Sequence, residues 1–483
     1  MRPLICETVT GRSMADLLAA RDACRHADLV ELRLDGIGDL DVAGVLKARR
    51  HPVVVTCRPV WEGGRFDGPE ESRKAVLERA LELGAEYVDI EWRAGFEALV
   101  RSYADRVVLS AHDFSGVPKD LTERARAMRS LGTVLIKIAV MPAGLRDLAV
   151  LREIGTSGSA VVIGMGGVGL PSRILAARFG SRWSYAGHGA APGQLPAARM
   201  VEEFRFRDVH ATTAIYGVVG NNVMHSLSPA MHNAAFAAAG IDSVYVPLLA
   251  SDFKDFLGFA DAFAVQGASV TIPYKLDALK AASEADSRAT SIGAANTLKR
   301  VSSGFAATNT DIDGFLAPLE TVYPGSLTRA RAAILGAGGS ARAAVVGLLS
   351  RGAHVTIHAR REAQARELAA AFDVGVGSWP VEADSWDLLV NCTPVGSAAA
   401  RNDSPLPAGP FRGKTVYDLT YRSPEEGESP LLIDARKAGC LTIDGLPMLI
   451  AQAERQFEWW TGTQPPEGVM ARALEEKFNE RDA

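Results

Sequence analysis

Eight short apolar runs, typical of β-strands, recur about every 25 residues through roughly the first 200 residues of the chain. Between them lie stretches rich in Ala, Leu and Arg whose apolar residues have helical spacing, such as Ser13–His26 and Glu70–Leu83. Strict alternation of strand and helix makes a parallel sheet, and eight such units predict a closed (β/α)8 barrel. The eight runs are Leu4–Val9, Leu29–Leu34, Val53–Cys57, Tyr87–Ile90, Val107–Ser110, Val134–Ile138, Val161–Ile163 and Trp183–Ala186.

Charged residues stand at the ends of several of these strands. Glu31 and Arg33 have the same parity along the second strand, so both side chains face the barrel interior near its top. Arg58 ends the third strand and adds a further positive charge. An internal salt bridge explains Glu31 and Arg33 if they are considered alone. Because barrels of this type carry their chemistry at this rim, the whole set indicates an active site.

Lys137 lies within an almost fully apolar strand, TVLIKIAVM. Its side chain either points out of the barrel end or is buried with a lowered pKa, because desolvation and neighbouring cations both disfavour the ammonium form. A neutral amine is what Schiff-base chemistry needs. His112, in SAHDF after the fifth strand, would by itself more often be structural. Together, the lysine and the histidine favour covalent catalysis with proton transfer.

A polar segment, Arg205–Thr213, leads into a new strand at Ala214–Val219. We therefore expect a barrel domain at residues 1–208 and a second enzyme at residues 209–483. A break at Tyr323-Pro324-Gly325 precedes the strand Ala332–Leu335, which predicts that the second enzyme has two α/β lobes. Strand–helix alternation continues through both lobes.

The first of these lobes carries polar motifs. Ser226 and Ser228 precede Pro229, which suits a helix start, and hydroxyls beside a helix N-terminus can hold a carboxylate. A plain helix cap explains the serines equally well. Lys275 and Asp311 would form a proton-transfer pair if they met, but their spacing in sequence equally allows a surface salt bridge.

The second lobe begins with a dinucleotide-binding fingerprint. A strand enters a glycine-rich turn that opens an Ala-rich helix, as G-x-G-x-x-A requires. The next strand ends at His358-Ala359-Arg360-Arg361, where an NAD site has Asp or Glu for the ribose hydroxyls. Two arginines suit the 2′-phosphate of NADP, although solvated arginines at a helix start are the alternative. The turn consists of Gly336, Ala337, Gly338, Gly339, Ser340 and Ala341.

Composition excludes several classes of function. The formal net charge is −5 and no basic block occurs, so nucleic acid is not an expected partner. No apolar run approaches the ~20 residues of a membrane span. The five cysteines form no CxxC pair and no metal-ligand spacing, which predicts free thiols in a reducing cytosol and no metal. The first strand begins at Pro3 or Leu4 and leaves no room for a signal peptide, so we expect a cytoplasmic enzyme.

The first half resembles the type I 3-dehydroquinate dehydratases from about Leu4 to Arg205. The matching motifs, in the family's order, are Glu31 with Arg33, Arg58 with Glu62-Gly63-Gly64, SAHDF, KIAVM, the loop before Ser172-Arg173, and Ala191-Pro192-Gly193-Gln194. The resemblance implies that Lys137 forms an imine with the substrate, that His112 is the general acid/base, and that Glu62 orients it. Substrate-binding roles are implied for Glu31, Arg33, Arg58, Arg173 and Gln194. Ala190 departs from the family, which often has serine there, so a hydroxyl contact to the substrate is missing or replaced.

The second half resembles shikimate dehydrogenase from about Ala214 to Phe478. SLSP, VTIPYK, GAANTL, NTD, GAGGSAR, NCTP, YDLTY and GLPMLIAQA occur in the family's order. The resemblance implies Lys275 and Asp311 as the catalytic pair, and a carboxylate site at Ser226 and Ser228. It also implies a substrate lobe at about residues 209–318 plus 445–483, and an NADP lobe at about 319–444. Thr271, Asn296, Tyr421 and Gln452 are implied near the ring hydroxyls.

These resemblances predict a bifunctional enzyme of the shikimate pathway, which leads to the aromatic amino acids. The first half would dehydrate 3-dehydroquinate, and the second half would reduce the product to shikimate with NADPH. One alternative is a second half that acts as a quinate/shikimate dehydrogenase. Another is a non-catalytic sensor of these metabolites, against which the presence of Lys137, His112, Lys275 and Asp311 argues.

Overall fold

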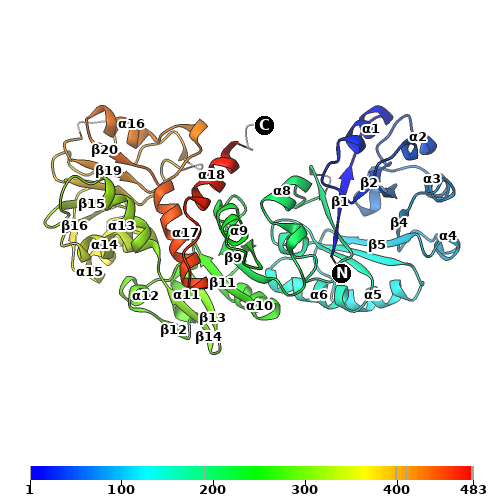
Figure 1. Ribbon diagram of the computed structural model, residues 1–483, viewed down its shortest axis with the longest axis horizontal. Coiled ribbons are helices and arrows are strands. Elements are labelled where there is room, and N and C mark those ends of the chain that lie inside the picture. The colour runs from blue at the N-terminus through cyan, green and yellow to red at the C-terminus, as the bar shows by residue number, and fades with distance from the viewer. Residues whose placement is uncertain (1, 190, 398–399, 408–410, 480–483) are drawn as a thin grey trace. The chain divides into compact units, whose positions relative to one another are not determined.

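The computed structural model describes residues 2–189, 191–397, 400–407 and 411–479. The chain divides into two compact units. One contains the residues up to Pro229 together with Asp242–Gln266, and the other contains Ala230–Ile241 and the residues from Gly267 onward. Figure 1 follows the chain from the barrel at its N-terminal end to the helices at its C-terminal end.

The first unit contains the predicted parallel barrel. Its strand order is β7-β6-β5-β4-β3-β2-β1-β8, and neighbouring strands are parallel. Between β7 and β8 the barrel is nearly closed, by a bridge that pairs Ala160 with Ser181. The strands are β1 (Leu4–Val9), β2 (Leu29–Arg33), β3 (Val53–Thr56), β4 (Tyr87–Glu91), β5 (Val107–Asp113), β6 (Leu135–Val140), β7 (Ala160–Gly164) and β8 (Trp183–Gly187).

Helices connect successive strands and surround the barrel, as Figure 1 shows for α1 to α4. The predicted helix at Ser13–His26 begins at Met14, because Ser13 is its cap: the Ser13 hydroxyl accepts a hydrogen bond from Asp16 N, and Asp16 accepts one from Ser13 N. The helices are α1 (Met14–Ala23), α2 (Val42–Leu46), α3 (Glu70–Glu82), α4 (Glu97–Ser102), α5 (Leu121–Arg129), α6 (Leu148–Thr156), α7 (Leu170–Ile174) and α8 (Ala197–Glu202).

The first unit extends past the barrel into β9 (Ala214–Gly220), β10 (Ser243–Leu249) and α10 (Phe253–Phe263). β9 and β10 pair in parallel. Asp255, on α10, accepts hydrogen bonds from the backbone N–H groups of Leu145 and Arg146, each at 2.9 Å. The compact unit therefore continues beyond residue 208, where the sequence predicts the end of the barrel domain. The division into two enzymatic domains stays a prediction.

The second unit contains two groups of strands. In the first group, β11 (Val265–Val270) pairs antiparallel with β13 (Thr297–Val301), which is followed in the sheet by β14 (Gly304–Thr308) and β12 (Glu284–Ala285). The second group is a parallel sheet of order β17-β16-β15-β18-β19-β20. Its strands are β15 (Arg331–Leu335), β16 (His354–His358), β17 (Gly375–Val376), β18 (Leu388–Asn391), β19 (Thr415–Asp418) and β20 (Leu441–Ile443). The predicted α/β fold with a Rossmann-type lobe is confirmed.

The helix α17 (Leu446–Thr461) joins distant parts of the sequence in this unit. Gln456 accepts a hydrogen bond from Ser269 on β11 at 2.6 Å, and Trp460 donates one to the carbonyl of Leu298 on β13. The remaining helices here are α9 (Ser228–Ala238), α11 (Lys275–Ala281), α12 (Ser287–Ile292), α13 (Asp311–Val322), α14 (Gly339–Ser350), α15 (Glu362–Phe372), α16 (Pro430–Lys437) and α18 (Val469–Asn479).

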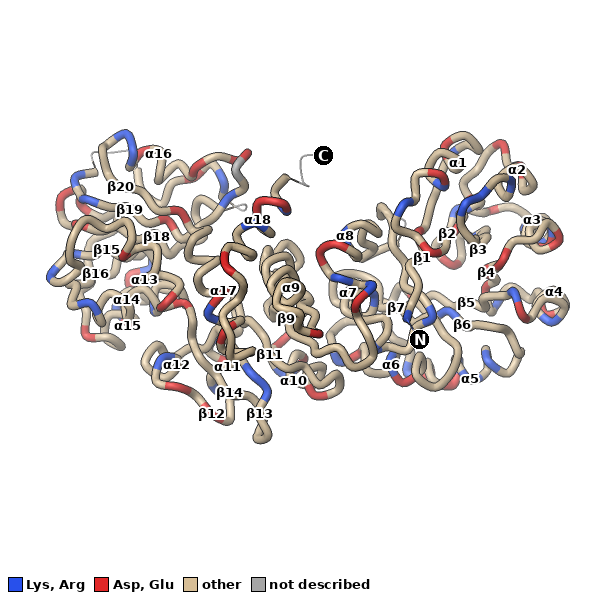
Figure 2. The backbone as a smooth tube through the Cα atoms, in the orientation of Figure 1, with Lys and Arg blue, Asp and Glu red and all other residues tan. Residues whose placement is uncertain are grey.

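Basic and acidic residues alternate along both units, without a long stretch of one sign (Figure 2). This distribution agrees with the small net charge of −5. Among the described residues, none of the helices has the length and apolar character that a membrane span requires.

Two candidate active sites

The barrel has a cavity of ≈ 140 Å³ at the C-terminal ends of its strands. All eight barrel residues that the sequence singles out contribute to its wall, although they come from six different β-α units. These residues are Glu31, Arg33, Arg58, Glu62, His112, Lys137, Arg173 and Gln194. Their convergence is the arrangement that the rim of such a barrel produces. Ala190, the predicted departure from the family, lies outside the described residues.

Lys137 projects from β6 into the interior, with 6% of its side chain exposed. Its Nζ donates hydrogen bonds to Glu31 Oε1 at 3.1 Å and to Asp89 Oδ2 at 3.0 Å. It also lies 4.1 Å from the centre of the Tyr185 ring, within the range of a cation–π contact. The sequence predicts cations around this lysine. The structure shows instead that carboxylates are in direct contact with it, while the guanidinium of Arg58 reaches the far oxygen of Asp89.

His112 lies at the end of β5, and its Nδ1 is 2.9 Å from Glu62 Oε2. Burial, together with the positive charges of Arg58 and Lys137, lowers the pKa of His112 well below its usual value. The imidazole is therefore neutral near pH 7 and able to accept a proton. Burial raises the pKa of Glu62 to about 8, against the opposing effect of Arg58. The contact between His112 and Glu62 holds the ring in one orientation.

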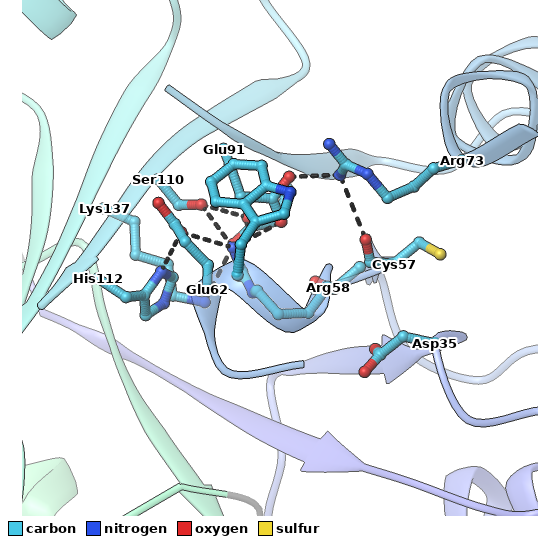
Figure 3. Close-up of polar contacts among 12 residues, drawn as sticks. Asp35, Cys57, Arg58, Glu62, Arg73, Glu91, Ser110, His112 and Lys137 are labelled. Atoms are coloured by element: carbon cyan, nitrogen blue, oxygen red, sulfur yellow. Dashed lines mark hydrogen bonds and ion pairs between the residues drawn. The ribbon is translucent and has the colours of Figure 1, made fainter. Parts of the chain in front are cut away.

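Arg58, in the cavity wall, is the centre of a buried polar network (Figure 3). It donates to Asp89 at 2.9 Å and to Glu91 and Ser110 at 2.8 Å each. Arg73 pairs with the second oxygen of Glu91, so both ends of this carboxylate are held by guanidinium groups. Charged groups are tolerated inside proteins when they are paired with opposite charges and hydrogen-bonded, as they are in this network.

The sequence interpretation missed Asp89, Glu91, Ser110 and Arg73. A signal for the first two was present, because Asp89 and Glu91 are two residues apart on β4 and so face the interior together. The same parity argument identified Glu31 and Arg33 on β2. The contribution of Arg73 had no such signal, since it reaches the network from helix α3.

Arg173 and Gln194 are held at the cavity by hydrogen bonds to neighbouring strands and loops. Arg173 is 2% exposed and donates to the carbonyl oxygens of Tyr185 and Pro192, while its Nε has no hydrogen-bond partner among the described residues. Gln194 donates to the Thr8 hydroxyl at 3.2 Å. A buried guanidinium with a free donor suits an anionic group of a ligand. Arg33 is paired with Asp35 by two hydrogen bonds of 2.8 Å.

In the second unit, Lys275 and Asp311 meet at 2.5 Å between Nζ and Oδ2. Lys275 opens α11 and Asp311 opens α13. Their side chains are 16% and 8% exposed, so the pair is not the surface salt bridge that the sequence left open. Asn296 donates to the other oxygen of Asp311 at 2.8 Å and thereby orients the carboxylate. A lysine fixed by a carboxylate is a competent proton donor.

The predicted glycine-rich turn lies beside this pair. Gly336 has a φ angle of +104°, a conformation that glycine adopts readily. The helix α14 begins at Gly339. A Cβ placed on Gly339 would be 3.3 Å from Lys275 Cδ, so the turn closely approaches the lysine. A helix N-terminus with free backbone N–H groups favours a pyrophosphate, which is how a dinucleotide would fit here.

The end of β16 carries the expected arginines. Arg360 and Arg361 are both exposed, and neither forms an ion pair with another described residue. The nearest acidic residue in sequence, Glu362, is paired with Arg366 at 2.6 Å. No carboxylate stands within His358–Arg361 itself, so both guanidinium groups fit a 2′-phosphate.

The other residues predicted for the second half are Thr271, Tyr421, Gln452, Ser226 and Ser228. Gln452, on α17, lies against α13, since a Cβ on Gly314 would be 2.7 Å from Gln452 Cβ. Thr271 is half-buried and Tyr421 is 39% exposed. Ser228 N donates to the Ser226 hydroxyl at 3.2 Å, as at a helix start. The carboxylate-binding role of these serines stays a prediction.

Three family models match the chain in the predicted order. Residues 5–211 match "Type I 3-dehydroquinase", residues 218–298 match "Shikimate dehydrogenase substrate binding domain", and residues 445–475 match "Shikimate 5'-dehydrogenase C-terminal domain". A chloroplastic bifunctional 3-dehydroquinate dehydratase/shikimate dehydrogenase from Arabidopsis thaliana is 32% identical over 503 residues, which cover 96% of this chain and 83% of the relative. This chain belongs to that bifunctional family.

Comparisons with the second half alone agree with this assignment. A shikimate dehydrogenase (NADP(+)) from Anaeromyxobacter dehalogenans is 40% identical, over 56% of this chain and 98% of the relative. A crystal structure of a shikimate dehydrogenase in complex with NADP+ has a TM-score of 0.50 and 33% identity, and covers 56% of this chain and 97% of that chain. The predicted family, the predicted pair of activities and the predicted cofactor NADP are confirmed.

Proposed function

We propose that the barrel dehydrates 3-dehydroquinate to 3-dehydroshikimate, and that the second half reduces this ketone to shikimate with NADPH. The observation that carries the first assignment is the convergence of Lys137, His112 and Arg173 on one cavity. The second assignment is carried by the contact between Lys275 and Asp311 beside the glycine-rich turn.

In the barrel, the Lys137 amine attacks the ketone carbon and water leaves, so that a C=N bond forms. The imine nitrogen gains a proton and becomes an acceptor for an electron pair. Neutral His112 then removes a proton from the carbon next to the imine carbon, and the electron pair moves toward nitrogen to give an enamine. The electron pair of the enamine then returns toward carbon and forms a C=C bond. The hydroxyl on the next carbon takes up a proton and leaves as water. Hydrolysis of the imine releases the enone and restores the lysine.

Polar groups of the cavity wall fix the substrate for these steps. Arg173 has a buried donor free for the substrate carboxylate, and Gln194 presents an amide at the same wall. We assign Arg58 chiefly to the support of the buried carboxylates, since its donors already contact Asp89, Glu91 and Ser110. Glu62 orients His112 through the 2.9 Å contact.

In the second half, NADPH supplies a hydride to the carbonyl carbon when it is bound. Lys275 donates the proton that the carbonyl oxygen must gain, and Asp311 holds the ammonium group in place. Asn296 fixes Asp311 from the opposite side. Arg360 and Arg361 would hold the 2′-phosphate, and the backbone of Gly336–Gly339 the pyrophosphate. Ser226 and Ser228 would bind the substrate carboxylate. For Thr271, Tyr421 and Gln452 we propose contacts with the ring hydroxyls.

The cellular location is a separate proposal. The five cysteines are free thiols in the structure, which suits a reducing compartment, and we propose the cytoplasm.

A coupled assay tests the two activities together. Purified full-length protein receives 3-dehydroquinate and NADPH, and the product is identified by chromatography against authentic shikimate. We expect NADPH consumption that depends on 3-dehydroquinate, with shikimate as the product. Accumulation of 3-dehydroshikimate without NADPH consumption would contradict the reductase assignment, and a lack of any dehydration would contradict the barrel assignment.

A further inference from the structure

Among the residues that the structure describes, Asp89 is the one direct partner of the Lys137 amine that lies outside the substrate cavity. Within the described part of the chain, two groups accept hydrogen bonds from Nζ, Glu31 and Asp89. Glu31 lines the cavity, where a bound substrate reaches it, but Asp89 is 0% exposed and is not part of the cavity wall. Its contact with the amine therefore does not depend on what the cavity contains.

The surroundings of Asp89 keep it ionised. Its Oδ1 accepts hydrogen bonds from Arg58 Nη2 at 2.9 Å and from the Ser110 hydroxyl at 2.6 Å, which leaves Oδ2 for Lys137 at 3.0 Å. Against the cost of burial, Arg58 and Lys137 lower the pKa of Asp89 below its usual range. A carboxylate held by a guanidinium, a hydroxyl and an ammonium group is a fixed negative charge.

We propose that Asp89 is the counter-ion that keeps the Lys137 imine protonated during dehydration. This inference rests on the proposed Schiff-base function of Lys137. The nitrogen of the imine stays on the same side chain, within reach of the carboxylate that contacts the amine. A neighbouring negative charge favours the charged form of a basic group, so the iminium keeps its proton at higher pH.

The protonated state matters because it makes the imine an electron acceptor. When His112 removes the proton from the adjacent carbon, the electron pair moves into a C=N bond whose nitrogen already carries its proton. The enamine that results has a neutral nitrogen, and no other proton transfer is needed at that step. If the imine had lost its proton, the same step would place a negative charge on nitrogen inside a buried site, which is costly.

Other charged and titratable groups also face the Lys137 nitrogen, and their effects differ from that of Asp89. Glu31 contributes a second negative charge, but it stands at the cavity wall with the Thr8 and Thr56 hydroxyls as further partners. Arg58 and His112 face the site from the third and fifth strand units, and Arg58 opposes a positive charge on the imine. Tyr185 and Cys6 lie on β8 and β1 beneath the lysine, and burial raises the pKa of both.

The decisive experiment compares Asp89→Asn with the wild type in the full-length protein. Borohydride trapping of the wild type first establishes the imine at Lys137. A lack of trapping there would overturn the proposed function itself, and with it this inference. We then expect Asp89→Asn to lower kcat about tenfold to hundredfold, with a much smaller change in KM. Because kcat reports groups of the enzyme–substrate complex, the alkaline limb of its pH profile should move to lower pH by about one unit or more.

Glu91→Gln is the matched control. Glu91 lies two residues away on the same strand, is equally buried and also accepts from Arg58, but its second oxygen contacts Arg73 rather than Lys137. Glu91→Gln should lower the stability of the barrel without moving the alkaline limb of the pH profile of kcat. If the alkaline limb does not move in Asp89→Asn, or moves equally far in Glu91→Gln, Asp89 is not the counter-ion of the imine.

A measurement on the wild type keeps the inference testable if Asp89→Asn fails to fold. The ¹⁵N chemical shift of the Lys137 imine, recorded with labelled lysine in the presence of substrate and product, reports its protonation. We expect the protonated value at a pH at which a small-molecule imine of the same ketone has lost its proton. A neutral imine at that pH would overturn the inference.

Discussion

Each half of the chain contains a lysine paired with carboxylate, but the two lysines stand in very different surroundings. Lys137 is on strand β6 of the barrel, contacts Glu31 and Asp89 and lies against the Tyr185 ring. Lys275 opens a helix and contacts Asp311, with 16% of its side chain exposed. The first is enclosed by a network that continues to Arg58 and Arg73, and the second stands beside a glycine-rich turn.

The difference corresponds to the two kinds of chemistry. A lysine that forms a covalent bond changes from ammonium to amine to iminium, so several fixed charges must hold its nitrogen in position through all three states. A lysine that donates one proton needs a single carboxylate for orientation and access to the substrate. Substitutions at four positions test this distinction.

Lys137→Ala should remove dehydratase activity by a factor on the order of 10⁴ or more, because no covalent intermediate can form. The reduction of 3-dehydroshikimate by the same protein should be unchanged, which also serves as a control for folding. Both rates are measured on one preparation. Residual dehydration near the wild-type rate would mean that Lys137 is a structural ion-pair partner.

Lys275→Ala should lower the rate of 3-dehydroshikimate reduction by about 10²–10⁴. The affinity for NADPH should change little, since the phosphates would contact the turn and Arg360. Steady-state kinetics and NADPH titration by fluorescence measure the two quantities. Normal turnover in this variant would show that Lys275 is not the proton donor. Lys275 would then have no chemical role, unlike Lys137.

Glu62→Gln should change how the stability of the protein depends on pH. The pKa of Glu62 is raised to about 8 by burial, so the folded state binds this proton more tightly than the unfolded state does. The contribution of Glu62 to the free energy of unfolding is fully present below the usual carboxyl pKa and is lost as pH rises through about 8. Glutamine cannot ionise, so the variant should gain up to a few kcal/mol relative to the wild type between pH 5 and pH 9. Urea unfolding at both pH values measures the difference, and an equal pH dependence in both proteins would contradict the assigned burial.

Arg360→Ala should raise the KM for NADPH and leave the KM for NADH nearly unchanged. A charge-assisted contact with the 2′-phosphate accounts for about a tenfold to hundredfold preference. Arg366→Ala is a matched control, because Arg366 is also exposed on this segment but is paired with Glu362. Equal wild-type efficiency with both cofactors would show that Arg360 is an ordinary solvated side chain.

The periodic features of the fold could be predicted from the sequence. The strands of the barrel were found because apolar runs alternate with helical stretches. Glu31, Arg33, Arg58 and His112 were recognised because they stand at or after strand ends, and Lys137 because it is a charge within an apolar strand. The roles of Glu62, Arg173 and Gln194 came from the family resemblance, and all eight residues line the cavity. The glycine-rich turn has a local signature, so it too could be read directly.

Long-range contacts could not be predicted in the same way. The partners of Lys137 are 106 and 48 residues away, which is why the sequence suggested cations where the structure has carboxylates. Asp89 was overlooked because its strand, YVDIE, was read as an apolar run. The extent of the first compact unit was also missed, since the contacts of Asp255 with Leu145 and Arg146 join segments more than 100 residues apart.

The most direct test of the contrast between the two lysines is reductive trapping. Borohydride is added to the full-length protein during turnover of 3-dehydroquinate, and the modified peptide is identified by mass spectrometry. We predict a stable adduct on Lys137 and none on Lys275, because only the barrel lysine forms an imine. An adduct on a different lysine, or dehydration that proceeds with no adduct at all, would contradict it.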